Sequence, residues 1–156
     1  MDKPEYTNDE IYTLVLRSHG ANHASYSVQV DQGFLPLGVN KFMCGIQYFI
    51  AEYESAAPNE ISDGGGPVRV LDIRTNIPKI GHFDSGRTGI NSTILCVDLS
   101  GAVEMKEQFA TTNINGLIIN VEIRSIQDGT ILQNMPHNVL CLSFRPVRNI
   151  ETAGRF

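Results

Sequence analysis

The chain lacks the features that place a protein in or across a membrane. None of the apolar segments in its 156 residues approaches the ~20 consecutive residues that a membrane-spanning helix needs. Its opening residues also lack the basic-then-apolar pattern of a secretory signal. We therefore expect a soluble protein without a membrane-inserted segment.

Charge is scarce, and positive charge is the scarcer sign. Only 19% of the residues are charged, the formal net charge is −5, and the 12 lysines and arginines are dispersed. Because nucleic-acid affinity depends mainly on clustered basic side chains, and the opening MDKPEYTNDE forms no basic arm, we expect no direct nucleic-acid binding. An under-charged surface is typical of a subunit covered by neighbours, and equally of a small β domain with neutral loops.

Cysteine is also rare and is not spaced for zinc. Cys44, Cys96 and Cys141 lie far from the paired CxxC spacing of zinc sites. Each lies in or beside an apolar, strand-like segment, which predicts buried free thiols. Their odd number and the absence of an export signal fit a reducing compartment, where disulfides do not persist.

In contrast, β-strand patterns are abundant. In the segment 117–125, Leu117, Ile119, Val121 and Ile123 alternate with polar residues, the period-2 pattern of a half-buried strand. Asp128-Gly129 follows, a pair typical of a two-residue hairpin turn. Residues 103–109 fit either a short helix or a strand. The predicted strands are 11–17, 25–30, 44–53, 68–74, 92–100, 117–125, 130–133 and 139–147.

These patterns predict an all-β fold in a single domain that spans residues 1–156, with short extended termini. About eight strands without helices for parallel crossovers indicate an antiparallel β-sandwich, most simply an eight-stranded jelly roll. The segment 55–67 has no apolar period and contains Gly64 to Gly66. We expect it to form an exposed loop.

Two groups of residues contain the types that catalysis or metal binding would need. His19 and His23 have the spacing of metal ligands on a helix, but Gly20 and Asn22 disfavour a helix and no third ligand is nearby in the sequence. His82-Phe83-Asp84-Ser85 contains the residue types of a hydrolytic triad. Neighbours in an extended segment point apart, whereas triad side chains must converge, so we predict no triad here.

The glycine-rich and acidic segments contain two further kinds of candidate site. Residues 63–67 and 85–89 lack the lysine and the strand-to-helix setting of a phosphate-binding loop, and turns are predicted instead. Asp72 and Asp98 lie in strand segments and could serve a carboxylate site, although acidic residues on strands usually face water. We predict no catalytic residue, no cofactor and no metal site, and therefore no enzyme.

The segment 34–39 is a candidate for contact with other proteins. Phe34-Leu35-Pro36-Leu37-Gly38-Val39 is apolar, but its proline and glycine make it a poor central strand. Its side chains either cap the domain's own core or lie on the surface for a neighbour. We name as candidate interface residues Phe34, Leu35, Leu37 and the C-terminal Phe156.

The segments YTLVLRS, SYSVQVD and INVEIRSIQDGTILQNMPHNVLCLSFRPV resemble the small jelly-roll virion proteins of large double-stranded DNA viruses and virophage-like elements. The likeness is carried by residues 14–18, Tyr26-Ser27, the Asp128-Gly129 turn and residues 135–144. It implies a minor capsid or capsid-associated protein without catalysis or cofactor, which resides in the virion and assembles in a reducing intracellular compartment of the host. Its partners would be other capsid proteins or copies of itself in an oligomeric assembly.

Two alternatives remain open from the sequence. One is a ligand-binding β-sandwich such as a carbohydrate-binding module, suggested by Tyr48, Tyr53, His82 and the long loop. The other is an enzyme on a jelly-roll scaffold, for which a converging set of two histidines and a carboxylate with metal would be the mark.

Overall fold

A computed structural model of the chain describes residues 10–52, 70–87, 89–98, 108–126 and 129–148. Within these ranges the secondary structure is eight β-strands and no helix. The strands are β1 (Tyr12–Arg17), β2 (Ser25–Gln29), β3 (Phe42–Ala51), β4 (Val70–Thr75), β5 (Ser92–Asp98), β6 (Gln108–Thr111), β7 (Ile118–Ser125) and β8 (Asn138–Pro146).

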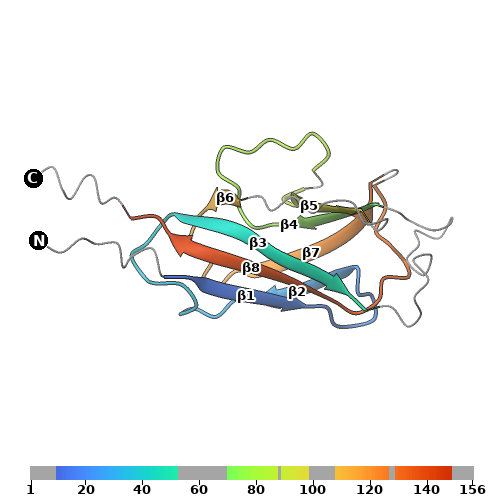
Figure 1. Ribbon diagram of the computed structural model, residues 1–156, viewed down its shortest axis with the longest axis horizontal. Helices are drawn as coiled ribbons and strands as arrows, with labels where there is room; N and C mark the ends of the chain where they lie inside the picture. The colour runs from blue at the N-terminus through green and yellow to red at the C-terminus, as the bar shows by residue number, and fades with distance from the viewer. Residues whose placement is uncertain (1–9, 53–69, 88, 99–107, 127–128, 149–156) are drawn as a thin grey trace, which may run out of the picture.

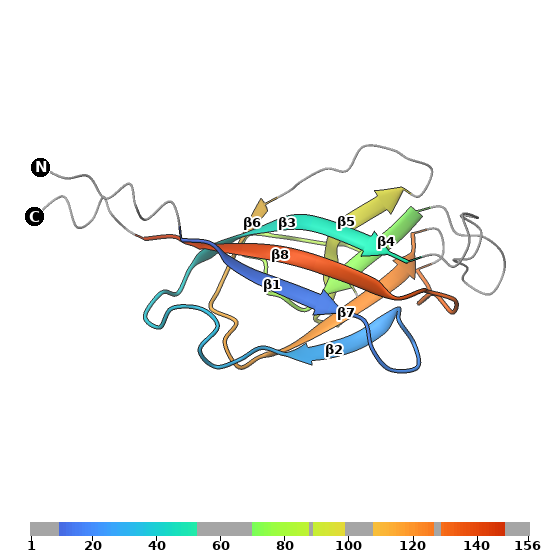
Figure 2. The ribbon, with the colours of Figure 1, turned by 60° about the horizontal axis from the view of Figure 1, so that its bottom comes forward.

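The strands form two antiparallel sheets of four that face each other (Figures 1 and 2). The order is β1-β8-β3-β6 in one sheet, called here the β8 sheet, and β2-β7-β4-β5 in the other, called the β7 sheet. The first strand therefore pairs with the last, the second with the seventh, the third with the sixth and the fourth with the fifth. The predicted antiparallel β-sandwich is confirmed.

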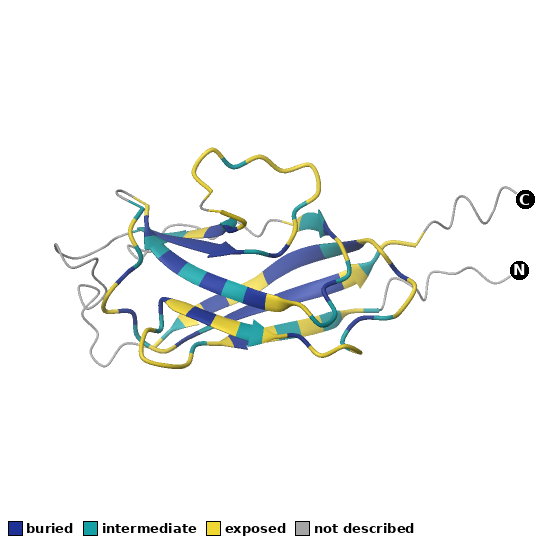
Figure 3. Cartoon of the chain, turned by 180° about the vertical axis from the view of Figure 1, so that it is seen from behind, coloured by how far each residue is buried: buried dark blue, intermediate teal, exposed yellow. Residues whose placement is uncertain are grey.

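The core lies between the two sheets and follows the alternation in the sequence. On β7, Ile119, Val121 and Ile123 are fully buried, as their spacing predicts. Leu117 precedes the strand and is exposed. In Figure 3 the strands alternate between buried and less buried residues. The β8 sheet contributes its own inward row of large side chains, which includes Leu16, Phe42, Ile46, Leu140, Leu142 and Phe144.

Two strand predictions differ from the structure. Residues 130–133 were predicted as a strand, but only Ile131 forms an isolated bridge, to Arg124. The amide of Leu132 still donates to the carbonyl of Ile123 (3.1 Å), after which the chain crosses to β8. Leu132 and Met135 fill the core along this crossing. The eighth strand is β6. Its residues 108–109 belong to the segment 103–109, whose sequence fits either a short helix or a strand. Residues 103–107 lie outside the described part.

The reversal after β7 is longer than the predicted two-residue turn. The backbone amide of Ser125 donates to the carbonyl of Thr130, and the amide of Gly129 donates to the carbonyl of Ser125 (2.9 Å each). Residues 126–129 therefore form the connection, of which 127–128 are not described. Gly129 has a φ of 74°, the left-handed conformation that favours glycine.

Candidate functional site

The predicted interface residues do not share one role. Leu35 is 1% exposed and belongs to the core, so its prediction as an interface residue was wrong. Phe34 is half-buried, with edge contacts to the rings of Tyr12 and Phe144. Leu37 is 84% exposed, and its interface role stays a prediction. Phe156 lies outside the described residues.

The backbone around Leu35 explains this division. Its amide donates to Oδ1 of Asn115 (2.7 Å), and its carbonyl accepts from Nδ2 of the same side chain (2.8 Å). This two-point clamp holds the segment against the sandwich. Leu35 therefore caps the core, which is the alternative that the sequence left open, while the chain turns outward at Leu37 before Gly38, whose φ is 82°.

His19 and His23 contact different groups, and His23 lies beside a third histidine. Nε2 of His19 lies 2.7 Å from the carbonyl oxygen of Ser27. His23 instead lies against His137, with ring centroids 4.0 Å apart. Burial, followed by the proximity of His137 and His19, lowers the pKa of His23. The described residues hold no group of three histidine, cysteine or acidic side chains arranged to bind a metal.

The cysteines divide in a way that the sequence did not predict. Cys44 is buried in the core, and burial raises the pKa of its thiol to about 12. Cys141 is also buried, although it lies on the outer side of β8, where Tyr48 is its cross-strand partner. Cys96 is exposed, so the prediction of a buried thiol was wrong there. It lies on β5, an edge strand of the β7 sheet.

Asp72 on β4 departs from the expectation that strand carboxylates face water. Its side chain is 5% exposed and that of Arg74 is 9% exposed, with Nε of Arg74 donating to Oδ2 of Asp72 at 2.8 Å. The hydroxyl of Thr93 on β5 donates to Oδ1 of Asp72 at 2.6 Å. The residue is buried because the chain between β4 and β5 folds back over this outer side of the β7 sheet.

That connection, residues 76–91, is called the β4–β5 loop, and the buried ion pair anchors it. Nη1 of Arg74 donates to the carbonyl of Gly86 (2.7 Å). The carboxylate of Asp84 accepts from the amides of Gly86 and Thr93 (2.9 Å each). The Thr93 amide in particular holds the pKa of Asp84 below its usual value. Asp84 therefore orders the loop through its hydrogen bonds to backbone amides.

The β4–β5 loop is also tied to the opposite sheet. The amide of Ile80 donates to the carbonyl of Ala110 on β6 (2.9 Å). Nζ of Lys79 donates to the carbonyl of Thr93 (3.0 Å) and lies 4.9 Å from the ring centroid of Phe109. The loop is thus fixed at its base by both sheets, while Phe83 at its tip is 87% exposed.

On the far side of the sandwich, the outer face of the β8 sheet carries two rows of mostly apolar side chains. Val15, Cys141 and Tyr48 are cross-strand partners in one row, and Arg17, Val139 and Ile50 in the next. Where the second row ends, the surface is hollowed into an open depression of about 460 Å³. Its lining comes from the adjoining ends of three strands: Arg17 and Ser18, Ile50 and Glu52, and residues 137–139.

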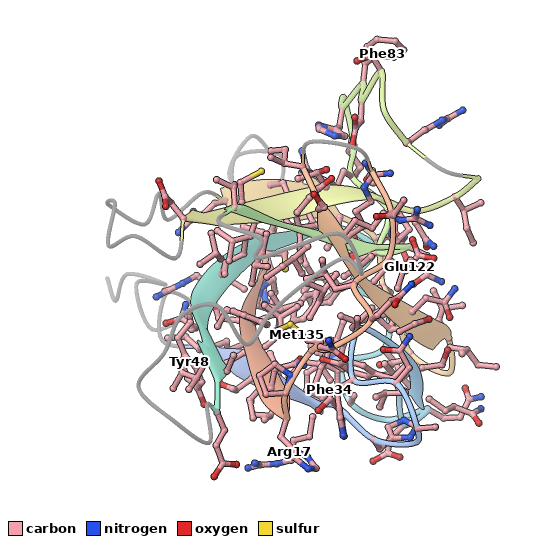
Figure 4. The ribbon with its side chains drawn as sticks, turned by 90° about the vertical axis from the view of Figure 1, so that its right-hand side faces the viewer. Arg17, Phe34, Tyr48, Phe83, Glu122 and Met135 are labelled. Atoms are coloured by element: carbon pink, nitrogen blue, oxygen red, sulfur yellow. The ribbon has the colours of Figure 1, made fainter. Side chains whose placement is uncertain are left out.

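Of the residues that suggested sugar binding, Tyr48 and His82 do not converge. Tyr48 lies on the outer face of the β8 sheet, whereas His82 lies in the β4–β5 loop with Phe83. Figure 4 shows Tyr48 and Phe83 on different sides of the molecule. Tyr53 lies outside the described residues. The depression, by contrast, had no signal in the sequence, because its residues become neighbours only through the pairing of β1 and β3 with β8.

Comparison with protein-family models and with curated proteins finds no match to this chain. Within the described ranges, no helix has the length and apolar character to cross a membrane.

Proposed function

We propose that this protein is a jelly-roll structural subunit of a viral particle, a minor capsid or capsid-associated protein that acts through protein–protein contacts. The observation that carries the proposal is the strand order. Pairing of the first strand with the last, the second with the seventh and so on inward is what results when one long antiparallel hairpin is rolled into two sheets. Eight-stranded sandwiches of this kind occur in viral capsids and in lectins.

The distribution of apolar side chains supports a role in contacts with other proteins. Large apolar residues are exposed on the outer face of the β8 sheet, at Val15, Tyr48 and Ile50, and on the β4–β5 loop, at Phe83 and Ile90. Exposed apolar groups gathered in patches, unlike scattered ones, are typical of interaction surfaces. The proposed partners are other capsid proteins or further copies of this chain.

The experiment is to look for the protein in virus particles purified from its biological source. Mass spectrometry and labelling with an antibody raised against the full chain should find it in particles washed with salt and detergent. Size-exclusion chromatography with light scattering would measure its self-association. A stable monomer that is absent from washed particles would contradict the proposal.

A second function is supported by the depression on the β8 sheet. Arg17, Glu52 and His137 place polar groups around it, and Tyr48 lies beside Ile50 on the same face of β3. Polar side chains next to an exposed aromatic ring could hold a sugar, as in a carbohydrate-binding β-sandwich. A glycan array probed with the full chain and with Tyr48→Ala tests this. Binding lost in the variant would favour it, and an array without hits would weigh against it.

A further inference from the structure

The tip of the β4–β5 loop is the apolar side chain of Phe83, and the base of the loop is hydrogen-bonded to both sheets. In Figure 1 the loop stands out from the sandwich above β4 and β5, and in Figure 3 it is almost entirely exposed. Phe83 at its tip is 87% exposed, more than any other large apolar side chain in the described part of the chain. Burial in the domain's own core therefore does not explain why this ring is there.

Hydrogen bonds order the loop backbone next to Phe83. Asp84, the residue next to Phe83, has its carboxylate fixed by the amides of Gly86 and Thr93. Gly86 is in turn held by the buried Arg74. Such preorganisation reduces the conformational entropy that is lost on binding. The backbone on either side of Asp84 is therefore ordered without a partner.

The depression on the β8 sheet has the matching features. Its volume of about 460 Å³ is within the range of pockets that accept ring-sized groups. Ile50, which is 59% exposed, and its cross-strand partner Val139 offer an apolar surface to a ring. The side chain of Ile50 points away from the core, so neither its truncation nor its burial by a partner should alter the core.

Charges on the two elements are complementary. Arg87 is exposed and belongs to the turn that follows Phe83, in which its amide donates to the carbonyl of Asp84. Glu52 lines the depression and supplies the opposite charge. Arg17 also lines the depression, and a guanidinium over the face of an aromatic ring is a favourable contact.

The two elements lie on opposite sides of one molecule. Figure 4 shows Phe83 at the top and Arg17 at the bottom, with both sheets between them. The tip of a chain therefore cannot reach the depression of the same chain. Only a second molecule can bring the two together.

We propose that the Phe83 tip of one copy seats in the depression of a second copy, with Arg87 of the first facing Glu52 of the second. This inference rests on the proposed function and names a partner for it. The contact is head-to-tail, so a pair of copies retains one free tip and one free depression for further copies. A single small contact of this kind is weak, and its strength in an assembly comes from repetition.

Two single variants of the full chain test the proposal. Phe83→Asp replaces the apolar tip by a charge and leaves the depression unchanged. Ile50→Asp places a charge in the depression and leaves the tip unchanged. Both side chains are exposed, so folding should be unaffected, which circular dichroism would verify. In analytical ultracentrifugation the mean mass of the wild-type species should increase with protein concentration. Each variant should associate at least about thirtyfold more weakly, as for an interface hot spot.

The decisive sample is an equimolar mixture of the two variants. One functional tip and one functional depression remain, so the mixture should form a dimer that does not grow further. Ile118→Asp, which alters a β7 side chain that is 56% exposed, much like Ile50, is the matched control and should assemble like the wild type. A wild type that stays monomeric, a Phe83→Asp variant that still assembles alone, or a mixture without dimers would overturn the proposal.

These outcomes are distinguishable from failure of the proposed function. A chain found in washed particles whose variants do not complement each other would leave the virion role standing and reject this contact. Complementation in solution by a chain that particles lack would retain the contact and reject the virion role.

Discussion

Replacement of Arg74 by methionine should destabilise the protein strongly, because it leaves a buried carboxylate without its cation. The side chains of Arg74 and Asp72 are only 9% and 5% exposed. Methionine keeps much of the volume of arginine but donates no hydrogen bond. Asp72 would retain the hydroxyl of Thr93 as its only remaining donor among those described above.

The magnitude follows from the burial of the pair. Removal of one partner from a buried ion pair costs about 3–5 kcal/mol of folding free energy. In a domain of this size that loss lowers Tm by roughly 10 °C. Urea unfolding followed by circular dichroism and a thermal scan measure both quantities.

Arg148→Met is the matched control. Arg148 pairs with Glu10 at 2.8 Å, but these side chains are 38% and 33% exposed. Exposed pairs contribute about 0–1 kcal/mol, so this variant should unfold nearly like the wild type. A loss of stability for Arg74→Met no larger than for Arg148→Met would refute the reasoning.

The double variant Asp72→Val with Arg74→Met separates charge burial from loop anchoring. Removal of both charges should recover most of the stability, because an apolar replacement of a buried ion pair is often neutral. The hydrogen bond from Arg74 to the carbonyl of Gly86 remains lost. The β4–β5 loop should therefore be cut faster by trypsin than in the wild type even though global stability has recovered.

Three further predictions concern single titratable or reactive side chains. Asp84→Asn should speed tryptic cleavage of the β4–β5 loop, because the amide offers one acceptor where the carboxylate offers two. In the wild type the anchoring of the loop by the Asp84 carboxylate is complete above the ordinary pKa of 3.8 and is lost as the pH falls below it. The free energy of unfolding should fall as the pH drops through 6.5, because His23 has a lowered pKa when folded, and His137→Asn should reduce that slope. Cys96 should react with a maleimide in the native protein.

Each of these has a control and a contradicting result. Asp31→Asn changes an exposed aspartate outside the loop and should leave cleavage unchanged; equal cleavage in both variants would argue against anchoring by Asp84. A flat stability profile around pH 6.5, or an unaltered slope in His137→Asn, would remove His23 as its origin. Labelling of all three cysteines in the native protein would show that Cys44 and Cys141 are accessible.

The fold class was predictable because strand alternation is a local property of the chain. The spacing of Ile119, Val121 and Ile123 places them on one face of a strand whatever its partners. The same reasoning failed for residues 130–133, where a β-rich composition could not reveal that the chain crosses between the sheets. The prediction for Leu35 failed for a similar reason, since the local sequence of an apolar residue beside a proline is the same whether the residue caps a core or faces a neighbour.

The candidate sites were far less predictable. Asp72 is buried because the β4–β5 loop folds over the outer side of β4, and nothing in the strand sequence signals that cover. His23 meets His137 only because β8 returns beside the first strands. The depression likewise joins Arg17, Ile50 and Val139 through the register of three strands.

By itself the sequence determined the short-range properties of this protein: which residues can share the face of a strand, where a glycine or proline interrupts the chain, and how little charge the surface carries. Those properties depend on neighbouring residues and on composition. The tertiary structure alone decided which faces are covered, which charges are paired and where the Phe83 tip and the depression lie. These depend on contacts between segments far apart in the chain, and such contacts are set by sheet pairing and packing together.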